Sequence, residues 1–220
     1  MAGAAEGGHS PTVLHEILTE ARTAGFLGPG PLERQIGHAE GFAAIARRLS
    51  PAGPARLVDL GSGGGLPGLV VAADWVEATV ALVEANARRA AFLRRAVEHL
   101  GLAGRVSVLE ERAEVCGRQG DLRAGFDGAL ARSFGRPAVV AECAAPLLKV
   151  GGWLIVSEPP RSEVEGDQEA RWPAEPLRQL GLEPAELIHE GFEYRTLRQA
   201  GPCPDRFPRR NGVPAKRPLF

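Results

Sequence analysis

The sequence predicts an α/β fold in which a mostly parallel, seven-stranded sheet carries helices on both faces. Short apolar segments rich in β-branched residues alternate with amphipathic segments of helical period along most of the chain. Such alternation is typical of parallel strands joined by crossover helices. The last two expected strands have the spacing of a hairpin instead, which predicts an antiparallel edge.

A helical cap is expected before the sheet. Residues 1–10 are small and polar, so we expect them to be disordered. Residues 11–50 contain two expected helices, at 11–24 and 32–49, because apolar side chains recur on one face of each. The cap is followed by a main domain at 51–200 and a basic tail at 201–220.

The main domain starts with a strand at 56–60, where Leu57, Val58 and Leu60 are suited to burial on both faces of a sheet. A helix is expected to start near Leu66, a second to span 86–100, and a third to run from Pro137 to about residue 149. A loop with a short helix is expected at 158–175. The other strands are expected at 79–84, 105–109, 126–131, 153–157, 185–189 and 194–198.

Composition limits the functions open to the chain. Its 220 residues can bury one full core, and its net charge of −1 means that nucleic-acid binding would need a local basic patch. The three cysteines are far apart and the five histidines scattered, so neither a disulfide framework nor a metal site is expected. Without a signal peptide or an apolar run near the roughly 20 residues of a membrane span, a reducing cytoplasm is the expected location.

Glycines crowd the turn after the first strand, at positions 61, 63, 64, 65 and 68. Glycine adopts positive φ readily and lets a ligand approach the backbone closely. A strand, a glycine turn and a helix N-terminus together form a site for the anionic part of a nucleotide-like ligand.

Two ligand classes compete for this turn. Gly63-x-Gly65-x-x-Gly68 matches the dinucleotide fingerprint. Asp59-x-Gly61-x-Gly63-x-Gly65 instead follows the pattern of S-adenosylmethionine (SAM) methyltransferases, in which the acid can face the methionyl ammonium but would repel a pyrophosphate. A purely structural connection without a ligand is the third alternative.

Candidate site residues also follow the other parallel strands, because ligands in such sheets bind at the strands' carboxyl ends. Glu84 could accept two hydrogen bonds from a ribose diol of either cofactor, or could be a solvated acid at a strand end. Residues 112–114 could flank an adenine. Arg132 could meet an anion at the mouth of the cleft, or pair with an acid of a nearby loop.

These motifs resemble those of the RsmG (GidB) family of bacterial small-subunit ribosomal RNA guanine-N7 methyltransferases. Residues 59–68 fit the family pattern D-x-G-[ST]-G-x-G-L-P-G, and residues 89–93 its K/R-R-x-x-F-L helix. Residues 112–114 resemble its R-x-E turn, 131–133 its A-R-A, 25–29 its loop before the domain, and 208–219 its basic C-terminus. The similarity spans nearly the whole chain and implies a Rossmann-like, class I methyltransferase that uses SAM.

The resemblance also implies where the cofactor binds. It places SAM contacts at Gly61, Leu66, Ala113, Glu114 and Arg132, the last of which could also position the reactants. The glycine turn and the second strand end complete the expected set with Asp59, Ser62, Gly63 and Glu84.

The chain departs from the family pattern at two places near the expected acceptor. Gly37 precedes His38 where many relatives have Arg-His, and Ser157-Glu158 stands where many have Lys-Gly. These departures leave open a methyltransferase of the same fold that acts on a small molecule. A protein that binds SAM or RNA without catalysis is also open.

The chemistry expected from the resemblance is methyl transfer to guanine N7. The N7 lone pair of neutral guanine can attack a sulfonium methyl without first losing a proton, so no general base is expected and positioning would suffice. The sequence agrees, because the fourth strand is not followed by the Asn/Asp-Pro-Pro-aromatic turn of amino methylators. The one Pro-Cys pair, at Pro202-Cys203, lies outside the core cleft.

RNA binding needs local positive charge. Residues 206–220 include five basic residues and no acid, and a basic helix lies near the expected cofactor. A solvated, solubilising tail is the alternative. We expect a monomer whose partner is 16S ribosomal RNA or the small ribosomal subunit. The candidate RNA-binding residues are Arg88, Arg89, Arg209, Arg210, Lys216 and Arg217.

Overall fold

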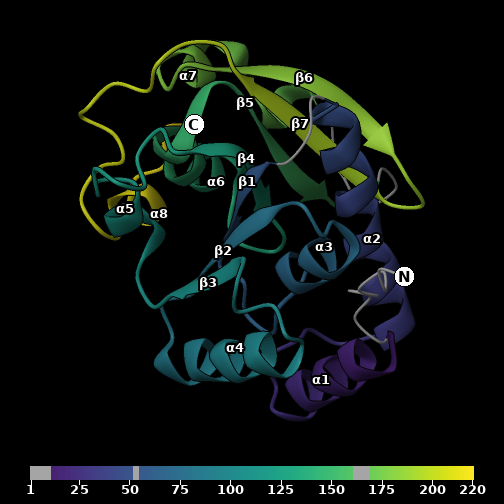
Figure 1. Ribbon diagram of the computed structural model, residues 1–220. Coiled ribbons are helices and arrows are strands. Elements are labelled where there is room, and N and C mark those ends of the chain that lie inside the picture. The colour runs from purple at the N-terminus through teal and green to yellow at the C-terminus, as the bar shows by residue number, and fades with distance from the viewer. Residues whose placement is uncertain (1–10, 52–54, 161–168) are drawn as a thin grey trace, which may run out of the picture.

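A seven-stranded sheet runs through the middle of the molecule in the order β3-β2-β1-β4-β5-β7-β6 (Figure 1). The computed structural model describes residues 11–51, 55–160 and 169–220; residues 1–10, which the sequence predicts to be disordered, lie outside this part. Strands β1 to β5 are parallel, and β7 is antiparallel to both of its neighbours. The strands are β1 (Arg56–Leu60), β2 (Thr79–Val83), β3 (Val106–Leu109), β4 (Phe126–Ala131), β5 (Leu148–Glu158), β6 (Leu182–His189) and β7 (Glu193–Gln199).

Helices cover both faces of this sheet (Figure 1). One face packs against α1 (Pro11–Thr23), α2 (Leu32–Leu49), α3 (Gly68–Asp74) and α4 (Ala87–His99). The other carries α5 (Ala113–Cys116), α6 (Pro137–Ala144) and α7 (Ala174–Arg178), with α8 (Val213–Lys216) against α6. Two short 3-10 turns, η1 (Ala145–Leu147) and η3 (Glu169–Arg171), complete the described elements.

The strands are apolar on both faces because each side of the sheet has its own core. Leu57 of β1 and Leu82 of β2 face α1 to α4, whereas Val58 and Val83 face α5 to α7. All four side chains are 0–1% exposed. This two-sided burial is what the continuous apolar strands predict for a parallel sheet, and the predicted fold is confirmed.

The predicted boundary between α6 and β5 is wrong. The helix expected to reach about residue 149 ends at Ala144, and β5 already starts at Leu148. Pro146, which has no N–H to continue the helical hydrogen bonds, lies in the 3-10 turn between them. Gly151, with φ of +87°, lies inside β5, where the pairing with β4 shifts register.

The last 20 residues fold onto the α5–α6 face. Phe207 is 4% exposed and packs in that core. Arg123 donates hydrogen bonds to the carbonyl oxygens of Cys203, Pro204 and Phe207. The segment predicted as a basic tail is therefore ordered along the body, and it contains a helix, α8, that the sequence pattern did not indicate.

Candidate functional site

The ends of β1, β2 and β4 lie side by side at one edge of the sheet. Leu60, the last residue of β1, is in register with Val83 of β2 and Ala131 of β4. The residues that follow these three strands are the glycine turn, Glu84 and Arg132. The parallel register thus brings together candidates that are far apart in the sequence.

The glycine turn needs its glycines. Gly61, Gly63 and Gly65 have φ of +67°, +56° and +102°, a region that residues with a side chain rarely adopt. A Cβ on Gly61 would lie 2.7 Å from the ring of Phe134, and one on Gly65 would lie 2.4 Å from Leu69. Gly63 has only backbone oxygens, at 3.6 Å or more, near this position.

Glu84 fastens the turn to the neighbouring strand. Its Oε2 accepts a hydrogen bond from Gly63 N at 2.9 Å, and its Oε1 accepts one from Asn86 N at 2.7 Å. Ser62 N donates to the Val83 carbonyl oxygen at 3.0 Å. Because each carboxylate oxygen has a second lone pair, Glu84 keeps the capacity to accept further donors.

Asp59 is buried and stabilises the end of the glycine turn, where helix α3 begins. It is 1% exposed, and its Oδ2 accepts a hydrogen bond from Gly68 N at the start of α3. Its Oδ1 has no hydrogen-bond partner within the described part of the chain. Burial raises the pKa of this carboxyl to about 7, although the Ser62 hydroxyl, the Gly68 N–H and the Arg132 charge oppose the shift. A dinucleotide pyrophosphate would need the N-terminus of α3 that Asp59 already occupies.

A cavity of about 380 Å³ lies over the turn. The Arg132 Nη2 donates to Gln35 Oε1 at 3.4 Å across it, and Gln35 Nε2 donates to the Gly28 carbonyl oxygen at 3.0 Å. Helix α2 and the loop before it thus form the wall of the cavity on the cap side. Its lining residues are Phe26, Leu27, Gly28, Pro29, Gln35, Gly61, Ser62, Gly63, Gly64, Leu66, Arg89, Arg132 and Ser133.

The predicted cofactor residues divide into three groups. Gly61, Ser62, Gly63, Leu66 and Arg132 line the cavity. Asp59 and Glu84 stabilise the turn by accepting hydrogen bonds from its backbone N–H groups. Ala113 and Glu114 do not line the cavity. The Glu114 carboxylate instead accepts a hydrogen bond from the backbone N–H of Gly212 at 3.0 Å.

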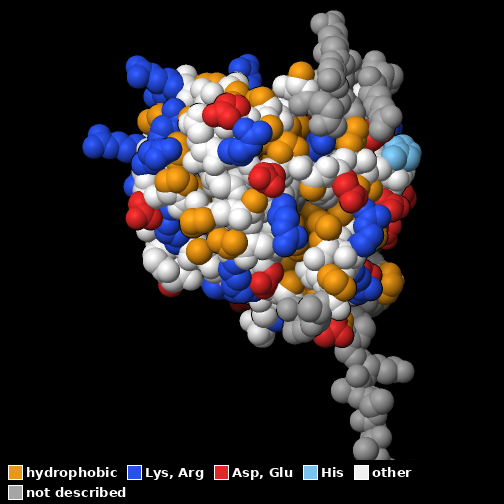
Figure 2. All heavy atoms as spheres, turned by 90° about the horizontal axis from the view of Figure 1, so that it is seen from above, with side chains coloured by type: hydrophobic (Ala, Val, Ile, Leu, Met, Phe, Trp, Pro, Cys, Tyr) orange, Lys and Arg blue, Asp and Glu red, His pale blue; other side chains and the backbone are white. Residues whose placement is uncertain are grey.

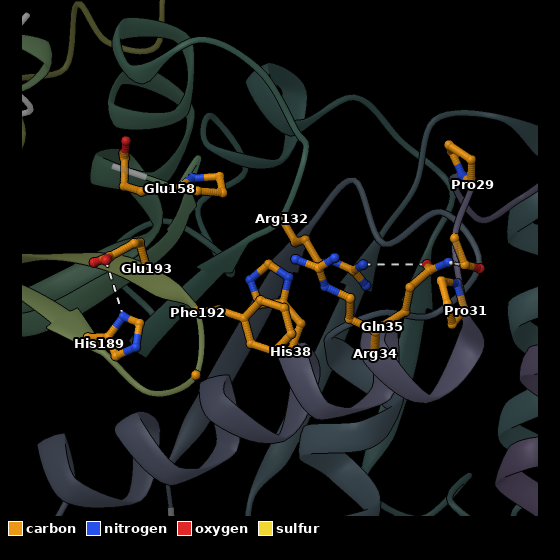
Figure 3. Close-up of a pocket in the computed structure, with 13 residues that line it drawn as sticks. Pro29, Pro31, Arg34, Gln35, His38, Arg132, Glu158, His189, Phe192 and Glu193 are labelled. Atoms are coloured by element: carbon orange, nitrogen blue, oxygen red, sulfur yellow. Dashed lines mark hydrogen bonds and ion pairs between the residues drawn. The ribbon is translucent and has the colours of Figure 1, made fainter. Parts of the chain in front are cut away.

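A second pocket of about 420 Å³ adjoins the first, and the two share Pro29, Gln35 and Arg132 (Figure 3). The rings of His38 and Phe192 stack in it, with centroids 4.4 Å apart and planes 11° apart. Burial, with the nearby arginine charges, lowers the pKa of His38 to about 4, so its imidazole is neutral at pH 7. Its other lining residues are Gly30, Pro31, Arg34, Glu158, Pro160, His189, Gly191 and Glu193.

The candidate RNA-binding residues differ in how free their side chains are. Arg209 is bound to the fully buried Glu142 through Nε at 2.8 Å and Nη2 at 2.6 Å. Arg89 lies over the ring of Phe26, 6.0 Å from its centroid. Four others, at positions 88, 210, 216 and 217, are exposed. Figure 2 shows Lys and Arg side chains along the side of the molecule where the C-terminal segment lies.

Glu158, the acid that departs from the family pattern, has two hydrogen-bond partners within the protein. Glu158 Oε2 accepts a hydrogen bond from Arg171 Nε and its Oε1 one from Trp172 Nε1, both at 2.7 Å. Its negative charge is therefore balanced by Arg171 at the rim of the second pocket.

Several lining residues were missed from the sequence. Gln35 and Arg34 come from α2, and Phe192 and Glu193 from the β6–β7 hairpin. Near the cap side, the sequence signals were the family likeness of residues 25–29 and the departure from the family pattern at Gly37-His38. The hairpin residues carry no motif, since only folding brings them to α2.

In residues 11–51, 55–160 and 169–220, no group of at least three His, Cys, Asp or Glu side chains is arranged to hold a metal ion. Across the same ranges no helix has the length and apolar character that a membrane span requires.

Solved methyltransferases share this fold. A methyltransferase from Geobacter sulfurreducens superposes with a TM-score of 0.62 at 14% identity, covering 87% of this chain and 90% of that one. An O-methyltransferase from Bacillus cereus, solved in complex with SAH, gives a TM-score of 0.59 at 15% identity, covering 86% and 91%. These likenesses concern the fold, which is the predicted Rossmann-like fold of class I methyltransferases.

Curated relatives are much closer in sequence. Ribosomal RNA small subunit methyltransferase G of Rubrobacter xylanophilus is 40% identical over 171 residues, covering 74% of this chain and 65% of the relative. The same-named protein of Prochlorococcus marinus (strain MIT 9303) is 40% identical, covering 76% and 68%, and that of Moorella thermoacetica is 36% identical, covering 80% and 73%. The chain thus spans about two thirds of the length of the first of these relatives.

A family model described as rRNA small subunit methyltransferase G matches residues 42–173, more than half of the chain. With relatives at this identity, it confirms the predicted family, the methyltransferase class and the SAM cofactor. The chain belongs to the rRNA small subunit methyltransferase G family.

Proposed function

We propose that this protein transfers a methyl group from SAM to N7 of a guanine in small-subunit ribosomal RNA. The observation that carries the proposal is the pair of adjoining pockets, one over the glycine turn and one beside it, which meet at Arg132. A transferase needs two such sites, because both reactants must be held in contact at once. Membership of the family supports SAM as the cofactor and small-subunit ribosomal RNA as the methyl acceptor.

Three features of the cavity over the turn support its proposed role as the SAM site. The turn leaves room over Gly63, and Gly61, Ser62 and Leu66 form the floor of the cavity. The proposal gives Glu84, at the end of β2, the role of accepting hydrogen bonds from the ribose hydroxyls, because each of its oxygens accepts one backbone N–H and keeps a second lone pair. We also keep the adenine role of residues 113 and 114 as part of this proposal, on the strength of the family resemblance alone.

The reaction needs position more than acid–base chemistry. When bound, SAM supplies an electrophilic methyl group on a sulfonium. The N7 lone pair of a neutral guanine accepts this methyl without losing a proton, so no side chain has to act as a base. The role assigned to Arg132 is to fix the junction of the two pockets, where Gln35 holds its guanidinium. Well-oriented reactants can gain about 7–11 kcal/mol from this kind of positioning.

The RNA is proposed to bind a basic surface formed by exposed residues of α4 and the C-terminal segment. Arg88, Arg210, Lys216 and Arg217 are exposed and can approach phosphates, whereas Arg209 is engaged by Glu142. We propose that the protein acts as a monomer on 16S ribosomal RNA or the small subunit, in the cytoplasm.

The test is methyl transfer from labelled SAM to small-subunit RNA, or to the small subunit itself, taken from cells that lack this protein. Nuclease digestion and mass spectrometry should find N7-methylguanosine at one position. Transfer to a small molecule but not to RNA would contradict the proposal in favour of another acceptor. Binding of SAM without transfer to any acceptor would point to a noncatalytic role.

A further inference from the structure

The tip of the β6–β7 hairpin places an aromatic ring in the second pocket. Gly191, with φ of +67°, lies in the turn, and the Glu190 N–H donates to the Phe192 carbonyl oxygen at 3.0 Å. Phe192 follows directly and lines the pocket opposite residues of α2 (Figure 3). Because its ring is only partly buried, it forms part of the pocket wall and not of the core interior.

His38 fixes the position of this ring. Its imidazole stacks on Phe192, with ring centroids 4.4 Å apart and planes 11° apart. The core holds His38 in turn, because the Tyr194 ring lies edge-on to it at 5.2 Å and the Tyr194 hydroxyl donates to the His38 carbonyl oxygen at 2.7 Å. The Phe192 ring is therefore already ordered, and a ligand that stacks on it pays little for ordering side chains.

The charges beside the ring suit a nucleotide. The Arg34 guanidinium lies 5.8 Å from the Phe192 ring centroid, and Arg132 lines the same pocket. The negative charge of Glu158 at the rim is balanced by Arg171. Proteins that bind unpaired RNA use this combination, in which a base stacks on an aromatic ring and arginines meet the phosphates.

The pocket also has the size and the location that an acceptor base requires. Its volume of about 420 Å³ is in the roughly 300–1,000 Å³ range of small-molecule sites. It shares Pro29, Gln35 and Arg132 with the cavity over the glycine turn. A base held in this pocket therefore lies next to the proposed SAM site.

We propose that the target guanine leaves the RNA stack and stacks on the face of Phe192 opposite His38. This inference rests on the proposed function. Taking a base out of an RNA stack costs free energy, and stacking on the protein ring offsets part of this cost. Because every base has a flat face, Phe192 holds the guanine in place and does not distinguish it from other bases.

The first test replaces the ring by an apolar side chain that cannot stack. We expect kcat/KM for RNA to fall about tenfold to a hundredfold in Phe192→Leu, as for a lost base-stacking contact. Phe192→Tyr keeps the ring and should stay within about threefold of the native value. SAM affinity, measured by calorimetry, should be unchanged in both, because Phe192 does not line the cofactor cavity. Equal activity of the two variants, whether native or reduced, would overturn the inference.

The second test removes the base and leaves the RNA backbone intact. Once the modified nucleotide is mapped, a ligated RNA can carry an abasic ribose at that position. With SAH present, the native protein should bind this RNA about tenfold more weakly than the RNA with guanine. Phe192→Leu should bind both RNAs with nearly equal affinity, because it has already lost the contact with the base. Fluorescence anisotropy gives the four dissociation constants, and an equal effect of base removal on both proteins would contradict stacking on Phe192.

These outcomes separate the inference from its foundation. If the native protein methylates guanine N7 in RNA and Phe192→Leu is as active as Phe192→Tyr, the role of Phe192 fails while the proposed function stands. If the native protein transfers no methyl to guanine N7 in RNA, both fail.

Discussion

At the scale of single residues, the buried carboxyl of Asp59 gives the protein a pH-dependent stability. Its pKa of about 7 in the folded state lies above its ordinary value of 3.8. Between these values the folded protein retains a proton that the unfolded chain has released. The protonated Asp59 carboxyl therefore contributes fully to the free energy of unfolding below about pH 4, and this contribution is lost as the pH rises to about 7.

Asp59→Asn isolates this effect, because the amide oxygen can still accept from Gly68 N. We expect the variant's free energy of unfolding to lack the decline that Asp59 causes between about pH 4 and 7, which can reach about 1.4 kcal/mol per pH unit. His38, whose pKa is lowered to about 4, acts in the opposite direction but is common to both proteins. Chemical denaturation at several pH values checks this; parallel pH profiles would contradict it.

Glu84 is the residue on which the ribose contact depends. In Glu84→Gln one acceptor oxygen and the charge are lost, so the affinity for SAM should fall about tenfold to a hundredfold. Glu110→Gln, in which an exposed acid loses its ion pair with Arg94, is the matched control and should bind SAM normally. Calorimetric titration gives both values, and unchanged affinity in Glu84→Gln would remove Glu84 from the site.

At the scale of elements, the glycine turn combines positive φ with close packing. Gly61→Val should abolish SAM binding while the protein stays folded, because a side chain at φ of +67° meets Phe134 and displaces the turn. Gly104→Val is the control, since Gly104 is exposed and has no atom within 4 Å of its Cβ position. Circular dichroism and SAM titration measure the two properties, and normal SAM binding by Gly61→Val would show that the turn is not the cofactor site.

The C-terminal segment has two roles that can be separated. Arg209→Ala leaves Glu142 buried without its cation, so the free energy of unfolding should fall by about 3–5 kcal/mol. A triple replacement of Arg210, Lys216 and Arg217 by Ala should change stability by only about 0.5 kcal/mol, but should weaken RNA binding and flatten its salt dependence. Denaturation and RNA titrations over a range of salt test both; unchanged RNA affinity in the triple variant would make the segment purely structural.

At the scale of the whole molecule, the sequence predicted the sheet and the cofactor turn for local reasons. Continuous apolar segments indicate strands that are buried on both faces of a parallel sheet. Glycines that directly follow such a strand indicate a turn whose backbone can be approached closely by a ligand. The register of β1 with β2 and β4 then brings Glu84 and Arg132 to the turn.

The parts that sequence reasoning missed depend on contacts between distant segments. Arg209 looked like a free base because its partner, Glu142, lies 67 residues away in the chain. The second pocket was not foreseen because α2 and the β6–β7 hairpin each supply only part of it. The end of α6 was misplaced because apolar residues continue through Pro146 into β5, so periodicity gave no boundary there.

The central claim is that the cavity over the glycine turn holds SAM with its methyl group facing the second pocket. A crystal structure of the protein with SAM tests this most directly. The account predicts the ribose hydroxyls within hydrogen-bond distance of Glu84 and the methyl group directed past Arg132 toward His38 and Phe192. A cofactor bound elsewhere, or a methyl group that faces away from the second pocket, would contradict it.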